Sequence, residues 1–195
     1  MSILELSEFI SAIPSQERPI LGIDGLSRSG KTTFVKQVRE CLEQEGIAYH
    51  IFHIDDHIVE RKRRYHTGFE EWYEYFHLQW DVQWLRENFF EKLAHDKQFD
   101  LPLYDPHTDT HDTKSVMLPE AGLIIVEGVF LQRKEWKEYY DHIIFLDCPR
   151  EKRFMRESEI TKQNREKFEK RYWKAEDYYM ETFRPLESAD FVLKT

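Results

Sequence analysis

Apolar residues along this chain gather in short runs that are separated by longer amphipathic stretches. Five of the runs predict β-strands, at residues 19–24, 48–54, 123–126, 142–146 and 191–193. The run at 123–126 reads Leu-Ile-Ile-Val without a polar interruption, as expected of a central strand in a parallel sheet. Strands that alternate with helices predict an α/β fold, a parallel five-stranded sheet with helices on both faces.

The amphipathic stretches predict the helices, at residues 2–13, 31–45, 68–96, 150–155 and 167–183. The first belongs to an N-terminal extension over residues 1–17, and we expect it to pack on the outside of the domain. Gly46 is expected to end the second helix, and the third is rich in aromatic residues and breaks near Trp80. Two extended segments, 99–104 and 114–118, enclose a turn-rich loop at 105–109. The charged run Arg61–Arg64 favours a solvated loop over an anion site.

One glycine-rich segment, Gly25–Thr32, carries the most specific signal for chemistry. It reads G-L-S-R-S-G-K-T and matches G-x-x-x-x-G-K-[ST], between a predicted strand and a predicted helix as this motif requires. Its glycines let the backbone approach a polyphosphate, and its N–H groups and the helix N-terminus face the anion. Lys31 would reach the β- and γ-phosphates, and the Thr32 hydroxyl would hold Mg²⁺.

The segment therefore predicts binding of ATP or GTP. The ATP-binding residues expected on this basis are Gly25, Leu26, Ser27, Arg28, Ser29, Gly30, Lys31, Thr32 and Thr33.

Two acids stand at the ends of predicted strands, Asp55 after the second and Glu127 after the apolar run at 123–126. Both strand ends should lie at the same sheet edge as the phosphate loop. Phosphoryl transfer to an alcohol needs a carboxylate that accepts the hydroxyl proton and oxygen ligands for Mg²⁺. Asp55 suits the first role, and Thr32, Glu127 and Asp55 would bind the metal, partly through water. The alternative is that the two acids only cap turns.

A transition-metal site is a further alternative, because His53, Asp55 and His57 alternate along the chain. The absence of a cysteine or a third histidine at ligand spacing argues against it.

Composition and charge narrow the class of protein. The chain has 195 residues, 41% of them hydrophobic, and fits one domain over residues 1–195. A formal charge of −9 argues against a nucleic-acid partner. Residues 150–174 are the exception, with 10 basic and 5 acidic side chains, and suit a mobile element that grips phosphates.

Cys41 and Cys148 are expected to be buried free thiols. We recognise no signal peptide in this sequence, and no apolar run approaches about 18 residues. We therefore expect no membrane segment and a cytoplasmic location.

Several short segments, in this order, resemble uridine kinases and the related phosphoribulokinase, pantothenate kinase and nicotinamide riboside kinase. They are the phosphate loop, Ile54-Asp55-Asp56, Trp80-Asp81, Leu101-Pro102-Leu103-Tyr104-Asp105, Ile125-Val126-Glu127-Gly128 and Ala189-Asp190-Phe191-Val192. The resemblance covers residues 19–194. It implies a P-loop NTPase fold of the nucleoside and nucleotide kinase type, with a basic lid at about residues 156–168. Uridine kinases are often oligomers, so a homo-oligomer is left open.

The resemblance also implies roles for individual residues. Asp55 would be the base for a sugar 5′-hydroxyl, and Glu127 would act at the Mg²⁺ and substrate end. The catalytic residues implied are Lys31, Asp55, Glu127 and Arg165, and the lid arginines that would contact ATP are Arg153 and Arg156. The residues expected to bind the acceptor are Asp81 at the ribose, Tyr104 at the base, and His107 and Asp109.

Two features depart from uridine kinases. Asp109 occupies the spacing of the family's recognition histidine, between His107 and His111, and the lid lacks the R-x-x-E-R-G-R pattern. The function expected is an ATP-dependent small-molecule kinase that makes a nucleoside 5′-monophosphate.

One rival is a kinase for another alcohol, such as nicotinamide riboside, pantothenate or a sugar phosphate, and Arg61–Arg64 could then read a phosphate on the substrate. Another is a nucleotide-binding regulator that acts through a partner, although the chain lacks an N-K-x-D base-recognition segment.

Overall fold

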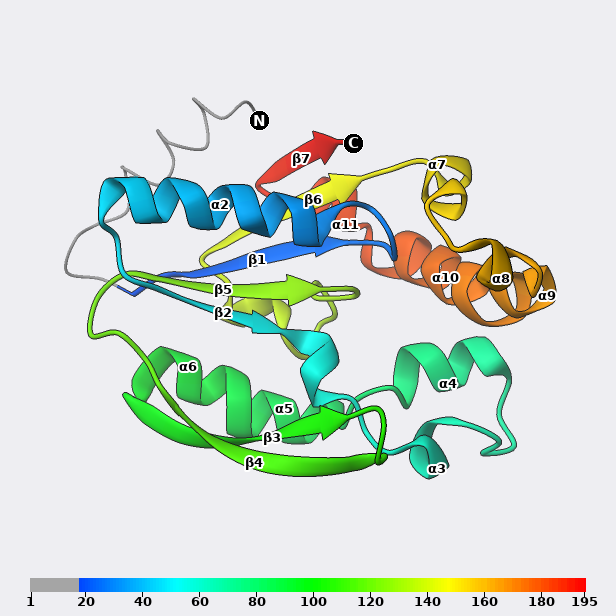
Figure 1. Ribbon diagram of the computed structural model, residues 1–195, viewed down its shortest axis with the longest axis horizontal. Coiled ribbons are helices and arrows are strands. Elements are labelled where there is room, and N and C mark those ends of the chain that lie inside the picture. Colours follow the sequence, from blue (N-terminus) through cyan, green and yellow to red (C-terminus); the bar gives the residue numbers. More distant parts are fainter. Residues whose placement is uncertain (1–17) are drawn as a thin grey trace.

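The fold is a parallel sheet covered on both faces, seen in a computed structural model that describes residues 18–195 (Figure 1). Within that range the five-stranded sheet has the order β2-β5-β1-β6-β7, with every neighbouring pair parallel. Its strands are β1 (Ile20–Gly25), β2 (Tyr49–His53), β5 (Leu123–Gly128), β6 (His142–Asp147) and β7 (Phe191–Lys194). The predicted α/β fold and its five strands are confirmed. The helix predicted at residues 2–13 lies outside the described residues.

Two hydrophobic clusters lie on opposite faces of the sheet, because successive side chains of a strand point to opposite sides. Leu21 and Ile23 of β1 pack in one cluster with Val38 of α2 (Lys31–Glu45). Ile20 belongs to the other cluster, which contains most of the aromatic residues, Phe89 among them. The aromatic residues of 68–96 are thus mainly core.

The helices follow the predicted amphipathic stretches closely. The aromatic stretch forms α4 (Glu71–His77), α5 (Val82–Leu85), the π-helical segment η2 (Arg86–Phe90) and α6 (Glu91–His95), with a break at Trp80–Asp81. The C-terminal stretch forms α7 (Arg150–Met155), α8 (Glu159–Lys162), α9 (Arg165–Lys167), the π-helical segment η4 (Phe168–Trp173), α10 (Lys174–Phe183) and α11 (Pro185–Ser188). Gly46 ends α2 with a φ of 66°, as predicted. Among the described residues, no helix combines the length and apolar character of a membrane span.

An antiparallel hairpin stands apart from the main sheet and was not anticipated. It pairs β3 (Gln98–Asp105) with β4 (Thr110–Met117), and Tyr104 lies opposite His111. The sequence predicts two extended segments and the turn between them but not their pairing, since β4 is mostly exposed and lacks a regular apolar alternation. The hairpin carries Tyr104, His107 and Asp109 to its tip.

The predicted solvated loop at Arg61–Arg64 is wrong in two respects. These residues form a short helix, α3 (Arg61–Arg64), and Arg64 is only 6% exposed. Its guanidinium donates to the Val59 carbonyl at 2.8 Å and to the hydroxyl groups of Tyr65 and Tyr104. These neutral acceptors, which come from three different segments, compensate for part of its lost hydration.

Candidate active site

The phosphate loop has the backbone geometry that its glycines predict. Gly25 ends β1 with a φ of 152°, and Gly30 precedes α2 with a φ of 104°. A Cβ on Gly25 would lie 2.7 Å from Ser29 Oγ and 2.9 Å from the Leu146 carbonyl, so no side chain fits there. The Ser29 N–H donates to the Leu26 carbonyl and closes the turn. The loop is thereby held compact at the N-terminus of α2, where an anion is favoured.

Lys31 lies under this loop and is only 8% exposed. Its Nζ donates to the carbonyl oxygens of Gly25 at 3.0 Å and Leu26 at 3.2 Å. Burial lowers the pKa of Lys31, and the carboxylates of Glu127 and Asp55 act in the opposite direction. Lys31, Asp55 and Glu127, all predicted to be catalytic, therefore lie within electrostatic range of one another.

Asp55 lies in η1 (Ile54–His57), a 3₁₀ turn directly after β2. Its side chain reaches the solvent, yet protein atoms surround enough of it that desolvation raises its pKa. Lys31 lowers this pKa, while Glu127 and Asp56 add to the increase. A carboxylate with a raised pKa accepts a proton more readily, which is the property required of a general base.

Glu127 is held by a histidine whose role the sequence did not reveal. His53 of β2 is the register partner of Glu127 on β5, and its Nδ1 lies 2.7 Å from Glu127 Oε2. This hydrogen bond raises the pKa of His53. His57 turns elsewhere, with its Nδ1 2.9 Å from the Pro102 carbonyl. Within residues 18–195, no three His, Cys, Asp or Glu side chains are grouped to hold a metal, so His53, Asp55 and His57 do not form the transition-metal alternative.

Mg²⁺ needs fewer protein ligands than a transition metal, because it keeps several waters and binds substrate phosphates. Thr32 lies exposed in the first turn of α2, and Glu127 and Asp55 lie near Lys31. One hydroxyl and two carboxylates near the phosphate loop are a donor set of the kind that this hard cation accepts. The residues present therefore fit the predicted metal.

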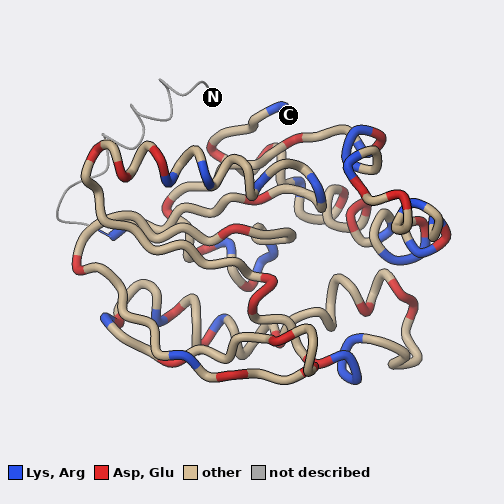
Figure 2. The backbone as a smooth tube through the Cα atoms, in the orientation of Figure 1, with Lys and Arg blue, Asp and Glu red and all other residues tan. Residues whose placement is uncertain are grey.

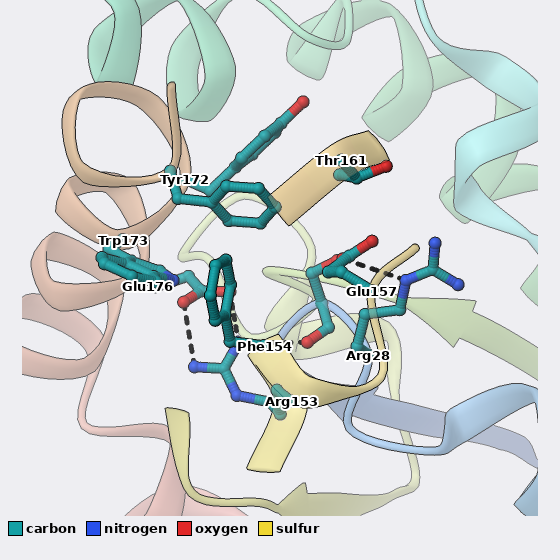
Figure 3. A pocket seen from close by; sticks show the side chains of 10 residues that line it. Arg28, Arg153, Phe154, Glu157, Thr161, Tyr172, Trp173 and Glu176 are labelled. Carbon is teal, nitrogen blue, oxygen red and sulfur yellow. Dashed lines mark hydrogen bonds and ion pairs between the residues drawn. The ribbon is translucent and has the colours of Figure 1, made fainter. Parts of the chain in front are cut away.

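A cavity of about 320 Å³ lies between the phosphate loop and the basic C-terminal segment (Figure 3). Its floor holds a buried ion pair, in which Arg153 of α7 donates to both carboxylate oxygens of Glu176 at 2.8 and 3.0 Å. Arg153 also donates to the Ser27 carbonyl at 3.0 Å. Arg153, predicted to contact ATP, thus joins the phosphate loop to α10 in this structure, and its phosphate contact stays a prediction. Its partner Glu176 was not predicted.

The other two lid arginines differ in position. Arg156 donates to the Arg28 carbonyl at 2.7 Å and lines a second hollow of about 380 Å³ together with Gly30 and Thr33. It therefore lies beside the phosphate loop, where a phosphate contact is expected. Arg165 instead pairs with Glu169 at 2.9 Å and lines neither of these two cavities. The structure does not bring Arg165 to the loop, and its catalytic role stays a prediction.

Asp24, which precedes the phosphate loop, belongs to a buried network that the sequence did not reveal. Its carboxylate accepts from the Tyr179 hydroxyl at 2.5 Å and from Gln132 Nε2 at 3.0 Å. Burial raises the pKa of Asp24. The network ties the end of β1 to α10, the helix that also supplies Glu176.

The predicted acceptor residues lie around α3 and the tip of the hairpin. Asp81 caps α5 by accepting from the Trp84 N–H at 3.2 Å. Tyr104 donates its hydroxyl proton to Asp109 at 2.8 Å, and this bond, after that from the Arg61 N–H, lowers the pKa of Asp109. Asp109 and Tyr104 are thus brought together. His107 is exposed in the turn, and its backbone N–H donates to the Asp105 carboxylate at 2.8 Å.

The parallel sheet and the phosphate loop define a P-loop kinase, and comparison with known proteins gives its family. The model of the phosphoribulokinase/uridine kinase family matches residues 20–167. The chain is 30% identical to a uridine kinase of Borrelia garinii subsp. bavariensis over 154 residues, which cover 75% of this chain and 69% of that one. It is also 30% identical to a Staphylococcus aureus uridine kinase over 152 residues, which cover 76% of this chain and 70% of that one. The chain belongs to the phosphoribulokinase/uridine kinase family.

Solved structures agree with this assignment. A protein of Bacillus stearothermophilus, described as a possible uridine kinase, is 50% identical with a TM-score of 0.87, covering 98% of this chain and 96% of that one. A D-glycerate 3-kinase of Cryptococcus neoformans is 11% identical with a TM-score of 0.58, and the match covers 98% of this chain and 92% of that one. This likeness shows the fold alone. The chain is thus a phosphotransferase that uses a nucleoside triphosphate and a small substrate.

Proposed function

We propose that this protein transfers the γ-phosphoryl group of ATP or GTP to a hydroxyl group, the 5′-hydroxyl of a nucleoside such as uridine or cytidine. The observation that carries the proposal is the meeting of Lys31, Asp55 and Glu127 beside the phosphate loop. Positioning and electrostatic stabilisation account for most of the catalysis in phosphoryl transfer, and these three groups supply both.

The donor binds with its phosphates along the N–H groups of the phosphate loop. Lys31 leaves the carbonyls of Gly25 and Leu26 and contacts the β- and γ-phosphates, which are stronger acceptors for its charge. Thr32, Glu127 and Asp55 hold Mg²⁺, partly through water. When bound, Mg²⁺ would neutralise the negative charge that develops on the phosphates.

The acceptor hydroxyl lies against Asp55, which orients it and takes its proton. The raised pKa of Asp55 supports this role, because proton transfer is favoured when the base is less acidic. Arg156 steadies charge on the phosphates. A lid at about residues 156–168 closes over the cavity beside Ser27 and excludes water.

The nucleoside acceptor is supported by the two uridine kinase relatives and by Asp81 and Tyr104, which match the family's segments for ribose and base. A kinase for another alcohol would use the same donor machinery with a different acceptor pocket. A regulatory nucleotide-binding protein would hydrolyse its nucleotide slowly without any acceptor.

The test is ADP release from Mg-ATP with uridine, cytidine, adenosine, nicotinamide riboside, pantothenate or ribulose 5-phosphate. Saturable stimulation by uridine or cytidine supports the proposal, and stimulation by another compound keeps the reaction but changes the acceptor. Release that no acceptor alters contradicts the proposal. Lys31→Ala is the control for the phosphate loop, and Lys36→Ala, on the exposed side of α2, is its match.

A further inference from the structure

One residue of the phosphate loop, Arg28, joins the loop to the lid. Its carbonyl accepts from Arg156 Nη1 at 2.7 Å, and its own Nε donates to Glu157 Oε1 at 3.0 Å. Arg156 and Glu157 directly follow α7 and stand at the start of the expected lid. Figure 3 shows the side-chain contact among the residues that line the cavity between the loop and the C-terminal segment. The lid therefore holds Arg28 at both its backbone and its side chain.

Arg28 has a backbone conformation that favours glycine. Its φ of 62° lies in the left-handed region, which a residue with a Cβ rarely adopts. Such a conformation persists where surrounding contacts impose it. The bonds from Arg156 and to Glu157 are contacts of this kind, so the shape of the loop at Arg28 is coupled to the position of the lid.

Arg28 differs from three other cations near the loop in the group to which it is bonded. Lys31 and Arg156 donate to backbone carbonyls, which are neutral and weaker acceptors than a phosphate. Arg153 makes two bonds to Glu176, and both side chains are buried, so their separation would be costly. Arg28 makes one bond to a carboxylate, and its own side chain is 55% exposed. Its partner thus competes with phosphate in charge, yet the pair is open to exchange.

Glu157 is the more deeply buried member of the pair. Its side chain is 8% exposed and lines the cavity together with Ser27. Within residues 18–195, Arg28 is the one cationic side chain that forms an ion pair with it. A polyphosphate at the loop would offer Arg28 two oxygens at once and would repel the Glu157 carboxylate. The carboxylate and the polyphosphate therefore compete for one guanidinium.

Acidic and basic residues are interspersed along α7, α8 and α9 (Figure 2), so an ion pair on the lid is not unusual in itself. Lys162 and Glu159, for example, pair three positions apart within α8. Such a pair stabilises one helical turn and can persist when the lid moves as a body. Arg28 and Glu157 stand 129 positions apart, on the loop and on the lid. Their contact has to break whenever the two segments separate.

We propose that Arg28 and Glu157 form a latch, which holds the lid against the phosphate loop until the phosphates of the donor take Arg28. Before the donor binds, the Glu157 carboxylate occupies a guanidinium that a phosphate would otherwise contact. When the phosphates arrive, Arg28 turns to them, Glu157 returns to water, and the lid is released to settle over the bound nucleotide. The inference rests on the proposed function, because it requires phosphates at the loop.

The test measures binding alone, with inorganic tripolyphosphate and with Mg-ATP as probes, by calorimetric titration without an acceptor. Glu157→Gln keeps the size of the side chain but removes the competing charge. We expect it to raise the affinity for both probes about two- to fivefold, the equivalent of a partly exposed ion pair that no longer has to be broken. Glu159→Gln makes the same change of charge at an exposed position of the lid and should leave the affinity nearly unchanged.

A double variant examines whether the effect passes through Arg28. Arg28→Ala should weaken binding, because the phosphates lose a guanidinium. Adding Glu157→Gln to Arg28→Ala should give little of the gain seen in the wild type, since the carboxylate then has no cation to withhold. A gain of the same size in both backgrounds would show a general effect of charge and would overturn the latch. Circular dichroism checks that each variant is folded.

Hydrogen exchange of residues 157–163 without nucleotide reports on the lid itself. Exchange should be faster in Glu157→Gln than in the wild type or Glu159→Gln, because the lid is no longer held at Arg28. Unchanged exchange, or unchanged affinity for both probes, overturns the latch and leaves the proposed function intact. Binding without transfer to any acceptor overturns the proposed function alone, and failure of the wild type to bind either probe overturns both.

Discussion

The proposed donor and acceptor sides of the candidate active site hold their charges in different ways. On the donor side Arg153 and Glu176 form an ion pair with side chains only 6% and 2% exposed. On the acceptor side Arg63 and Asp81 pair at a similar distance, but with side chains 51% and 42% exposed. A buried pair has given up water and depends on its partner, whereas an exposed pair exchanges readily with ligands.

This difference matches what each side must do. The polyphosphate of a nucleotide is the same in every donor, so its loop benefits from a fixed backbone, held by Arg153 at Ser27 and by the network of Asp24. The family's own description joins phosphoribulokinase with uridine kinase, whose names give different acceptors. An exposed pair at Asp81 can be changed without disturbing the core. If the proposed roles hold, the buried pair would serve the reaction common to all donors, and the exposed pair would serve the choice of acceptor.

The largest effect is expected where the two sides meet, at Asp55. Asp55→Asn keeps the size of the side chain but removes the proton acceptor, and should lower kcat about 10²- to 10⁴-fold. Binding of Mg-ADP should fall far less than kcat, because the phosphate loop is intact and Thr32 and Glu127 still hold the metal. Steady-state kinetics and calorimetric titration measure the two quantities.

Asp56→Asn is the matched control, since Asp56 is the exposed neighbour in the same 3₁₀ turn. It should keep most of the activity. Equal losses in the two variants would contradict the assignment of Asp55 as the base and attribute the effect to charge at the site in general.

The sequence could predict the local motifs of the site but not the contacts that join distant segments of the chain. The phosphate loop and the strand-end acids Asp55 and Glu127 were predictable, because their spacing along the chain fixes their chemistry. His53 was not recognised as the partner of Glu127, because that contact depends on β2 lying next to β5 in the sheet. Glu176 was missed because it meets Arg153 across a long stretch of chain, with no local pattern to mark the pair.

On the acceptor side the sequence was misleading for a different reason. A run of like charges predicts a solvated segment, and that is correct for Arg61 and Arg63. One helical turn directs successive side chains to different sides, however, and Arg64 enters the protein between Tyr65 and Tyr104. The hairpin that carries Tyr104 was missed as a pair because β4 is largely exposed.

The next largest effect is expected at the buried pair of Arg153 and Glu176. Arg153→Met leaves Glu176 without its partner in the interior and should lower the free energy of unfolding by about 3–5 kcal/mol. It should also weaken nucleotide binding, because the Ser27 carbonyl loses its donor. Urea unfolding measures the first effect and Mg-ADP titration the second.

Arg150→Met is the control on the same helix. Arg150 pairs with Asp177 at the exposed surface, and its loss should lower the free energy of unfolding by no more than about 1 kcal/mol. If both variants were equally stable, burial of the Arg153 pair would have no energetic consequence and the contrast between the two sides would fail.

A smaller effect is expected at Arg63, which forms the exposed pair with Asp81 on the proposed acceptor side. Arg63→Ala should lower the free energy of unfolding by about 0.2–1 kcal/mol, since solvent screens the pair with Asp81. A loss as large as that of Arg153→Met, measured by the same urea unfolding, would show that Arg63 is a structural residue.

The smallest effect is expected at His53, which lies between the two sides with its side chain 43% exposed. The hydrogen bond to Glu127 raises the pKa of His53, so the folded protein holds this proton more tightly than the unfolded chain does. The resulting stability is fully present below the unfolded pKa of about 6.5 and is lost as the pH rises through the higher folded value. Because the pair is partly exposed, His53→Gln should remove less than about 1 kcal/mol, and the loss should be greater near pH 6 than near pH 9.

His50 on the same strand provides a control of opposite sign. Burial lowers the pKa of His50, so the folded protein favours its neutral form. The contribution of His50 to the free energy of unfolding is therefore present above the unfolded pKa and is lost as the pH falls. Urea unfolding of His53→Gln and His50→Gln across this pH range should therefore give opposite slopes for the difference from the wild type. If the two variants gave slopes of the same sign, the pair of His53 and Glu127 would not be charged. His53 would then be only a neutral hydrogen-bond partner of Glu127.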